Sequence, residues 1–356
     1  MKLGILTFHR AHNYGAVLQA YGLQEYLTSL GHDVYVIDYK PAYISDSYPR
    51  DGKAYWLSTK PIASLKGLYN YFVHSDIRHA RWDGFEKFIN VHLNLYPYQD
   101  GMSLEEFDAV FIGSDQVWSP AHTGGKYDPL LFGEGIKCKI IPYAPSCTNM
   151  YLTEKDLEFF REHLATMAAV SVREPKMKEI LQPLTKKQIS VVVDPSLLAG
   201  KDCFEKIAVT KDPNPYILTY EINEHSEIFS MAKGLAKKYN IDIVELTNGM
   251  VFHHRKTMHE EATPEEFLGY IKNAKCVITT SFHGTAFSLL FHTPFFTVLQ
   301  NNNADGRMVA LLNKIGMNDR LINLNDKIGD INFCRKYDLK ELIVKSKEFI
   351  NEALAN

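Results

Sequence analysis

Residues 2–38, KLGILTFHRAHNYGAVLQAYGLQEYLTSLGHDVYVID, decide the fold. A short apolar run at 2–8 leads into a polar loop, and apolar side chains then recur at helical spacing over 16–30 until Gly31. This spacing predicts a helix that ends at the glycine. A second apolar run at 34–38 follows at once. Strand, helix and strand in this order are typical of a parallel sheet with a right-handed crossover.

The same alternation continues along the chain and predicts a second sheet. Further strands of the first half are expected at 108–113, 138–144, 168–172 and 189–193. A polar, proline-containing stretch at 199–215 interrupts the pattern, after which strands and helices alternate again. We therefore expect an α/β protein with two Rossmann-like, doubly wound parallel-sheet domains and an interdomain cleft.

The predicted domain boundaries follow from this pattern. Residues 1–200 form the N-terminal domain and 201–337 the C-terminal domain, while 338–356 read as an amphipathic helix that could return to pack on the first domain. Residues 41–106 carry no convincing strand but many aromatic and basic side chains. They predict a helical insertion, which is either a packing annex or a wall of the binding cleft.

Composition excludes several classes of protein. The 356 residues are 46% hydrophobic and 23% charged, which is typical of a folded, water-soluble chain. A net charge of −3 argues against a nucleic-acid partner, so any anion site must be local. The N-terminus lacks a signal-peptide core, no apolar run reaches the roughly 20 residues of a transmembrane helix, and the five cysteines show no paired spacing. These features predict a cytoplasmic protein that could associate peripherally with the inner face of the membrane, and they leave its oligomeric state open.

Ligands of open parallel sheets bind at the carboxyl ends of the strands, so the loops there are the candidate sites. The loop after the first strand ends in Asn13, Tyr14 and Gly15 and leads directly into a helix. It is either a structural turn or a loop that binds an anion at the helix N-terminus. The expected strand 168–172 ends in Arg173, which either points its guanidinium at the crevice or forms a plain ion pair with its neighbour.

The loop after the expected strand 108–113 combines small polar groups with one indole. Such groups could hydrogen-bond the hydroxyls of an acceptor, and the indole could stack on a sugar face, although the same residues could form an ordinary turn. The candidates here are Ser114, Asp115, Gln116 and Trp118.

The densest signal lies in the second half, where a predicted strand runs into Ser281-Phe-His-Gly-Thr285 and a helix starts at once. His283 is thereby placed beside free helical N–H groups, where it could exchange a proton near neutral pH or simply cap its own helix. Arg307 opens a later helix, where a cation is mildly unfavourable unless an anion is bound. Asp-x-Asp pairs, His-Glu-x-x-His and Gly-x-Ser-x-Gly are absent from the sequence, so neither a metal nor a serine hydrolase is expected.

Read together, these segments resemble the polysaccharide pyruvyl transferase family over roughly residues 1–320. The resemblance rests on the following blocks: Asn13–Gln19, Gly113–Trp118, Ser171–Glu174, Asp194–Leu198, Pro264–Leu268, Thr280–Ser288 and the loop at Arg307. It implies a glycosyltransferase-B-like fold and a transferase that moves an enolpyruvyl unit from phosphoenolpyruvate onto two hydroxyls of a sugar in a cell-surface polysaccharide precursor, forming a ketal.

The resemblance also implies roles for individual residues. His283 matches the catalytic acid and Arg173 a donor-binding arginine. The chemistry of the reaction, apart from the resemblance, suggests that Asp115 could orient the acceptor hydroxyls or accept a proton. Ser281 stands where several members have an arginine, so Arg307 could supply that donor contact, together with Gly284 and Thr285 at the helix start. Asn13, Tyr14, Gly15, Ser114, Gln116 and Trp118 would face the acceptor.

The implied partners are phosphoenolpyruvate as co-substrate, with no cofactor, and a nucleotide- or lipid-linked sugar or oligosaccharide. Acceptor choice would reside in residues 41–106 and 248–262. Two alternatives stay open, a glycosyltransferase that uses a nucleotide sugar on the same fold and a protein that binds an anionic glycan without turnover.

Overall fold

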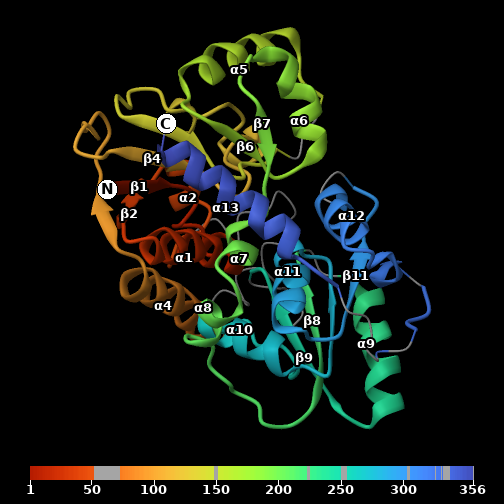
Figure 1. Cartoon of the computed structure of the whole chain (residues 1–356). Coiled ribbons are helices and arrows are strands. Elements are labelled where there is room, and N and C mark those ends of the chain that lie inside the picture. Colours follow the sequence, from red (N-terminus) through yellow and green to blue (C-terminus); the bar gives the residue numbers. More distant parts are fainter. Residues whose placement is uncertain are drawn as a thin grey trace.

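The chain forms two α/β domains built on parallel sheets, seen in the computed structural model (Figure 1). The structure describes residues 1–51, 73–147, 151–222, 225–249, 255–302, 305–324, 326–329, 331 and 337–355. Within these residues every helix is too short or too polar to cross a bilayer.

The N-terminal domain contains a five-stranded parallel sheet with the order β3-β2-β1-β4-β5. Its strands are β1 (Lys2–Leu6), β2 (Asp33–Asp38), β3 (Leu95–Pro97), β4 (Ala109–Ile112) and β5 (Lys139–Pro142). Strands β6 (Val170–Val172) and β7 (Ile189–Val191) form a parallel pair that lies beyond β5. The Ala168 N–H, just before β6, donates to the Ile140 carbonyl of β5 at 2.8 Å. The strand order reverses between β1 and β4, which is where ligands bind in doubly wound sheets.

Helices cover both faces of this sheet. They are α1 (Tyr14–Ser29), α2 (Ala42–Ser45), α4 (Ser75–His92), α5 (Glu154–Thr166), α6 (Pro175–Leu181), α7 (Pro195–Leu198) and α8 (Lys201–Glu205). Helix α1 is buried around most of its circumference, because it packs on the sheet on one side and on α7 and the second domain on the other. The predicted boundary at residue 200 falls between α7 and α8.

The C-terminal domain contains a second five-stranded parallel sheet with the order β12-β11-β10-β8-β9. Its strands are β8 (Tyr216–Glu221), β9 (Asp242–Thr247), β10 (Cys276–Thr279), β11 (Phe295–Leu299) and β12 (Leu321–Asn323), and its helices are α9 (Ser226–Tyr239), α10 (Pro264–Asn273), α11 (Phe282–Phe291) and α12 (Asp305–Lys314). Here the order reverses between β8 and β10. The sequence did not predict β12, which has only three residues.

The prediction that residues 41–106 contain no strand is wrong. Leu95–Pro97 form β3, which pairs in parallel with β2 at the edge of the first sheet. The strand escapes a pattern search because it is three residues long and ends in a proline, which only an edge position tolerates. The rest of the described insertion is helical, in α2 and α4, while residues 52–72 lie outside the described part of the chain.

One apolar cluster joins the two domains. It contains side chains of β1, α1 and α4 together with side chains of β8, α10 and α11, so the core continues across the domain interface. The last helix, α13 (Lys340–Ala355), contributes Phe349 and Ile350 to this cluster. It lies along the N-terminal domain, where the Ser346 hydroxyl accepts the Val193 N–H at 2.9 Å (Figure 1).

Candidate active site

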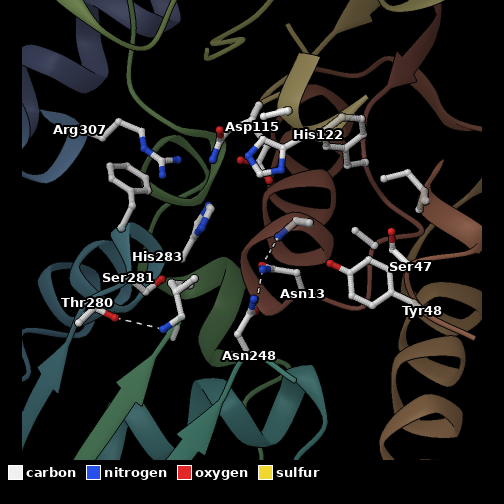
Figure 2. Close-up of a pocket in the computed structure, with 18 of the residues that line it drawn as sticks. Asn13, Ser47, Tyr48, Asp115, His122, Asn248, Thr280, Ser281, His283 and Arg307 are labelled. Carbon is white, nitrogen blue, oxygen red and sulfur yellow. Dashed lines mark hydrogen bonds between the residues drawn. The ribbon is translucent and has the colours of Figure 1, made fainter. Parts of the chain in front are cut away.

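The two points of strand reversal face each other across a cleft of about 680 Å³ (Figure 2). The loops after β1, β4, β8, β9, β10 and β11 all contribute to its walls. Residues far apart in sequence therefore meet here because each follows the carboxyl end of a parallel strand. The insertion closes one side through α2 and Tyr48.

Helix α1 begins at the floor of the cleft. Its N-cap residue Asn13 accepts the Ala16 N–H at 3.3 Å and donates its amide to Asn248 Oδ1 of the C-terminal domain at 2.7 Å. Gly15 lies directly against the imidazole of His283, since a Cβ added there would be 1.9 Å from Nδ1. Gly15 is thus part of the site, but its contribution is the space that it leaves for a histidine of the other domain.

His283 lies in the first turn of α11, the helix that Ser281 caps by accepting the Gly284 N–H at 3.4 Å. Its Nε2 is buried, has no hydrogen-bond partner in the described part of the chain and lies 3.7 Å from Asp194 Oδ2. Ser281 also lines the cleft. We did not predict a role for Asp194 from the sequence. Its position directly after an expected strand, at the start of DPSLL (194–198), could have indicated one.

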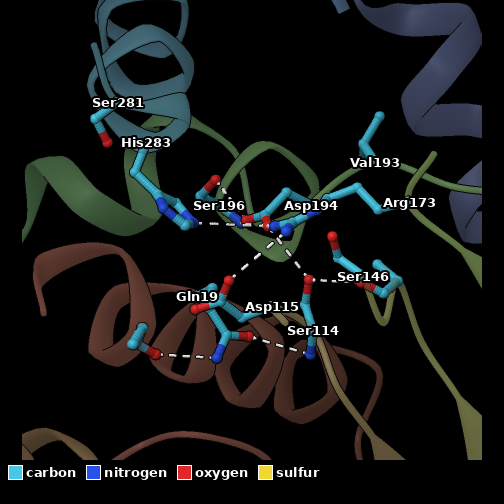
Figure 3. A network of polar contacts seen from close by, with 12 residues as sticks. Gln19, Ser114, Asp115, Ser146, Arg173, Val193, Asp194, Ser196, Ser281 and His283 are labelled. Carbon is cyan, nitrogen blue, oxygen red and sulfur yellow. Dashed lines mark hydrogen bonds and ion pairs between the residues drawn. The ribbon is translucent and has the colours of Figure 1, made fainter. Parts of the chain in front are cut away.

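Arg173 belongs to a buried polar network beneath the cleft (Figure 3). It donates to Asp194 at 2.6 Å and lies 3.6 Å from Asp115 and 3.5 Å from Glu174. Burial alone would lower the pKa of Arg173, but these three carboxylates outweigh it and raise that pKa. The sequence left a choice between a cleft-facing guanidinium and an ion pair with Glu174. The contact with Glu174 occurs, Asp194 is the closest partner, and the side chain lies beneath the cleft and does not line it.

Arg307 approaches the same point from α12. Among the described residues it forms no hydrogen bond or ion pair, and its Nε is buried without a partner. The guanidinium carbons of Arg307 and Arg173 lie 5.9 and 4.9 Å from the ring centre of Phe282, so both arginines flank the same ring. Burial lowers the pKa of Arg307, and the nearby charge of Arg173 lowers it further. A half-buried guanidinium without a described partner, beside a second guanidinium, is the arrangement that an anion relieves.

Two residues after β4 and one further histidine complete the wall opposite Arg307. Asp115 and Gln116 line the cleft, and Gln116 Oε1 is buried without a partner. His122 faces Asp115 in Figure 2. Partial burial lowers the pKa of His122, an effect that the charge of Asp115 opposes and that of Arg307 reinforces. Sequence reasoning missed His122 because it follows the strand by ten residues, and missed Asn248, which the carboxyl end of β9 could have indicated.

Several residues expected to face ligands are instead part of the scaffold. Trp118 is fully buried, and its indole donates to the Leu131 carbonyl at 2.9 Å. Tyr14 stacks on Phe267 and donates to the Ala262 carbonyl at 2.8 Å. The predicted sugar stacking by Trp118 and acceptor contact by Tyr14 are therefore wrong, because a large aromatic side chain beside a strand end is drawn into the core.

Three smaller candidates also face inward. The Ser114 hydroxyl donates to the Ala144 carbonyl and to Asp194, at 2.9 and 3.2 Å. Thr285 is fully buried and bonds the Ser281 carbonyl. Gly284 is packed so closely on Thr279 that a Cβ would lie 2.3 Å from its hydroxyl. These residues shape the loops, whereas Asn13, Asp115, Gln116, Ser281, His283 and Arg307 line the cleft.

Comparisons with known proteins agree with this geometry. Residues 13–303 match the family model described as polysaccharide pyruvyl transferase. No curated protein is significantly similar in sequence. The structure is similar to a UDP-N-acetylglucosamine 2-epimerase from Rickettsia bellii, with 10% identity and a TM-score of 0.50 over 100% of this chain and 96% of that one. The glycosyltransferase-B-like arrangement of two Rossmann-like domains is thus confirmed.

Less similar structures include two proteins with bound nucleotides. One is the UDP-GlcNAc 2-epimerase of Methanocaldococcus jannaschii in complex with UDP-GlcNAc and UDP, at 12% identity and a TM-score of 0.43, covering 100% of this chain and 93% of that one. The other is the Streptomyces sp. SF2575 glycosyltransferase SsfS6 complexed with thymidine diphosphate, at 12% identity and a TM-score of 0.39, covering 100% and 96%.

Proposed function

We propose a reaction for this chain on the basis that it belongs to the polysaccharide pyruvyl transferase family. It transfers an enolpyruvyl group from phosphoenolpyruvate to two hydroxyls of a sugar and so forms a pyruvate ketal. The chain is a transferase by its family, while the donor and the ketal product are our proposal. No cofactor enters this reaction, and we place it on the cytoplasmic side of the membrane, where precursor sugars carried by nucleotides or lipids would be the acceptors.

The observation that carries the proposal is the pair of arginines beside His283, of which Arg173 is buried and Arg307 is half-buried. In the part of the chain that the structure describes, Arg173 Nη2 and Arg307 Nε are both buried and have no hydrogen-bond partner. Phosphoenolpyruvate carries a phosphate and a carboxylate, and each is an acceptor that guanidinium groups bind well. The N-termini of α1 and α11 add backbone N–H groups at the same place. A donor held there would present its methylene carbon to the imidazole.

The reaction balances with His283 as the only proton donor. The ring gives a proton to the methylene carbon, whose double-bond electrons form the new C–H bond and leave C2 electrophilic. One sugar hydroxyl adds to C2. The C2–O bond to phosphate then breaks, with its electron pair leaving on phosphate, and the second hydroxyl closes the ketal. One hydroxyl proton restores the imidazolium and the other leaves on phosphate, so no external acid or base is consumed.

The acceptor would lie on the other wall of the cleft. Asn13, Asp115 and Gln116 offer hydrogen bonds to hydroxyls, and Tyr48 offers an aromatic face. A cleft of about 680 Å³ is of the size that holds a ligand larger than phosphoenolpyruvate alone. Asp115 and His122, which face each other, are the groups placed to receive the hydroxyl proton before it returns to His283.

The test is incubation of the protein with phosphoenolpyruvate and a panel of nucleotide- and lipid-linked sugars. Phosphate release and a new ketal methyl signal in the NMR spectrum are expected for the wild type, and neither for His283→Gln. Thermal shifts separate the alternatives, because a ligand at 100 times its dissociation constant stabilises by about 2.7 kcal/mol. A shift with a nucleotide sugar and not with phosphoenolpyruvate would favour a glycosyltransferase, and a shift with glycan alone would favour a binding protein.

A further inference from the structure

Asp194 accepts hydrogen bonds on both of its carboxylate oxygens. Its carboxylate is buried directly after β7, in the N-terminal domain. Oδ1 accepts the N–H and the hydroxyl of Ser196, at 3.0 and 2.8 Å. Oδ2 accepts Arg173 Nη1 at 2.6 Å and the Ser114 hydroxyl at 3.2 Å. The same oxygen faces His283 Nε2 at 3.7 Å across the domain interface (Figure 3).

The two nitrogens of the His283 ring have different surroundings. Among the described residues, Nε2 is buried without a hydrogen bond and faces the carboxylate of Asp194. Nδ1 lies on the side of Gly15 and, among the described residues, forms no hydrogen bond, while the residue as a whole lines the cleft. An imidazole that faces a carboxylate through one nitrogen carries a proton on that nitrogen and leaves the other for chemistry.

We propose that Asp194 is the positioning residue of His283, that it holds the proton of the neutral ring on Nε2, and that Nδ1 is the nitrogen that exchanges a proton with the substrate. The inference rests on the proposed function for the identity of that substrate. Because Asp194 comes from one domain and His283 from the other, the acid is assembled at the domain interface. The distance of 3.7 Å exceeds a hydrogen bond, as is common before a substrate is bound.

The charges around the ring support this arrangement. Among the described residues, Asp115, Glu174 and Asp194 supply three carboxylates, whereas Arg173 and Arg307 supply two guanidiniums. These five charges sum to −1, and Asp194 is the negative group that lies beside Nε2 of the ring. Burial raises the pKa of Asp194, but His283, Arg173 and the Ser196 N–H outweigh it and hold that pKa well below its usual range. The carboxylate is therefore ionised wherever the enzyme is folded at neutral pH.

The first experiment is ¹⁵N NMR of the histidine rings in the substrate-free wild type, with the His283 signals among the 14 histidines assigned by comparison with His283→Gln. We expect the Nε2–H tautomer when the ring is neutral. Asp194→Asn should lose this preference, because the amide has no charge and can turn its NH₂ toward the ring. Ser196→Ala, which removes one bond to Oδ1 and keeps the carboxylate, should retain it.

The second experiment is kinetic. Asp194→Asn is expected to lower kcat by up to about 10⁴-fold, the loss known for replacing an aspartate that orients a catalytic histidine by asparagine. KM for phosphoenolpyruvate should change less than tenfold, because Arg173 keeps its charge and its other carboxylates. A neutral wild-type ring protonated on Nδ1, or an Asp194→Asn ring that keeps Nε2–H, would overturn the inference. The expected tautomers without any ketal formation would leave the inference in place and refute the proposed function.

Discussion

Gly15 makes the cleft possible, because any larger residue would occupy the place of the His283 ring. We predict that Gly15→Ala lowers kcat by about 10- to 100-fold, since a displacement of the acid by about 1 Å is enough for such a loss. Overpacking should also cost about 1–3 kcal/mol of unfolding free energy. Steady-state kinetics and urea denaturation measure the two effects.

The matched control is Gly234→Ala, in the middle of α9, where a Cβ meets no atom within 4 Å. It should leave kcat unchanged and stabilise the protein by about 0.5–1 kcal/mol, because alanine is the better helix former. A Gly15→Ala enzyme as active as the wild type would show that the ring has room to move.

Replacing Arg307 and replacing Arg173 should have different effects on the stability of the protein. Arg307→Met should abolish the thermal shift caused by phosphoenolpyruvate yet leave the ligand-free protein as stable as the wild type or more so, because no described carboxylate loses its partner. Arg173→Met should lower the free energy of unfolding by about 3–5 kcal/mol, since the buried carboxylate of Asp194 loses its guanidinium partner. Equal losses of stability in both variants, measured by urea denaturation, would contradict this reading.

At this scale the sequence predicted the position of a residue better than the direction of its side chain. The carboxyl-end rule correctly brought Asn13, Asp115, His283 and Arg307 to one cleft. The same rule could not predict that Trp118 is buried. Its indole packs on α5 and on residues 129–132, and no local sequence pattern indicates that these segments contact the loop after β4.

Helix α4 connects the insertion to both domains through one side chain. Arg81 is buried and donates to the Tyr14 hydroxyl and to the carbonyls of Glu260 and Asn248, at 2.9, 2.8 and 3.2 Å. The last two acceptors belong to the C-terminal domain, so α4 ties the domains together just below the cleft. The aromatic and basic insertion is therefore a structural tie through α4 as well as a wall of the cleft through α2 and Tyr48.

We predict that Arg81→Met destabilises the protein by about 2–4 kcal/mol, because several hydrogen bonds to a charged donor are lost and buried carbonyls are left unpaired. The Asn13–Asn248 contact should loosen with it, so kcat should also fall. Urea denaturation and kinetics measure both. Arg161→Met, on the exposed surface of α5, should change neither, and a similar loss in the two variants would show that the tie at Arg81 has no special importance.

At the level of elements, the periodicity of the sequence predicted the long strands and helices. It missed β3 and β12, which are both three residues long. Each lies at the edge of its sheet, where pairing with a neighbour defines the strand more than its own apolar pattern does.

For the whole molecule, the alternation of strands and helices was sufficient to predict two doubly wound domains. It did not predict that the domains share one apolar cluster. Domains joined by small polar interfaces usually move relative to one another, whereas a continuous apolar core opposes such motion. The cleft is therefore held together by the fold, and Asp194 meets His283 without a ligand to bring them together.

This shared site should make stability depend on pH. The pKa of Asp194 is held below its unfolded value despite burial, chiefly by His283 and Arg173, and that of Asp38 is lowered, also against burial, by His9 and Arg10. A carboxyl with a depressed folded pKa stabilises the protein above its unfolded pKa, and this stability is lost as the pH falls through the interval between the two values. We therefore expect the urea midpoint to decline steadily below about pH 4.

Because an aspartate whose pKa is lowered by two units contributes about 2.6 kcal/mol, Asp194→Asn should be less stable than the wild type at pH 7 and should lose less stability on acidification. Parallel curves for the two proteins would mean that the cross-domain charges contribute nothing to folding.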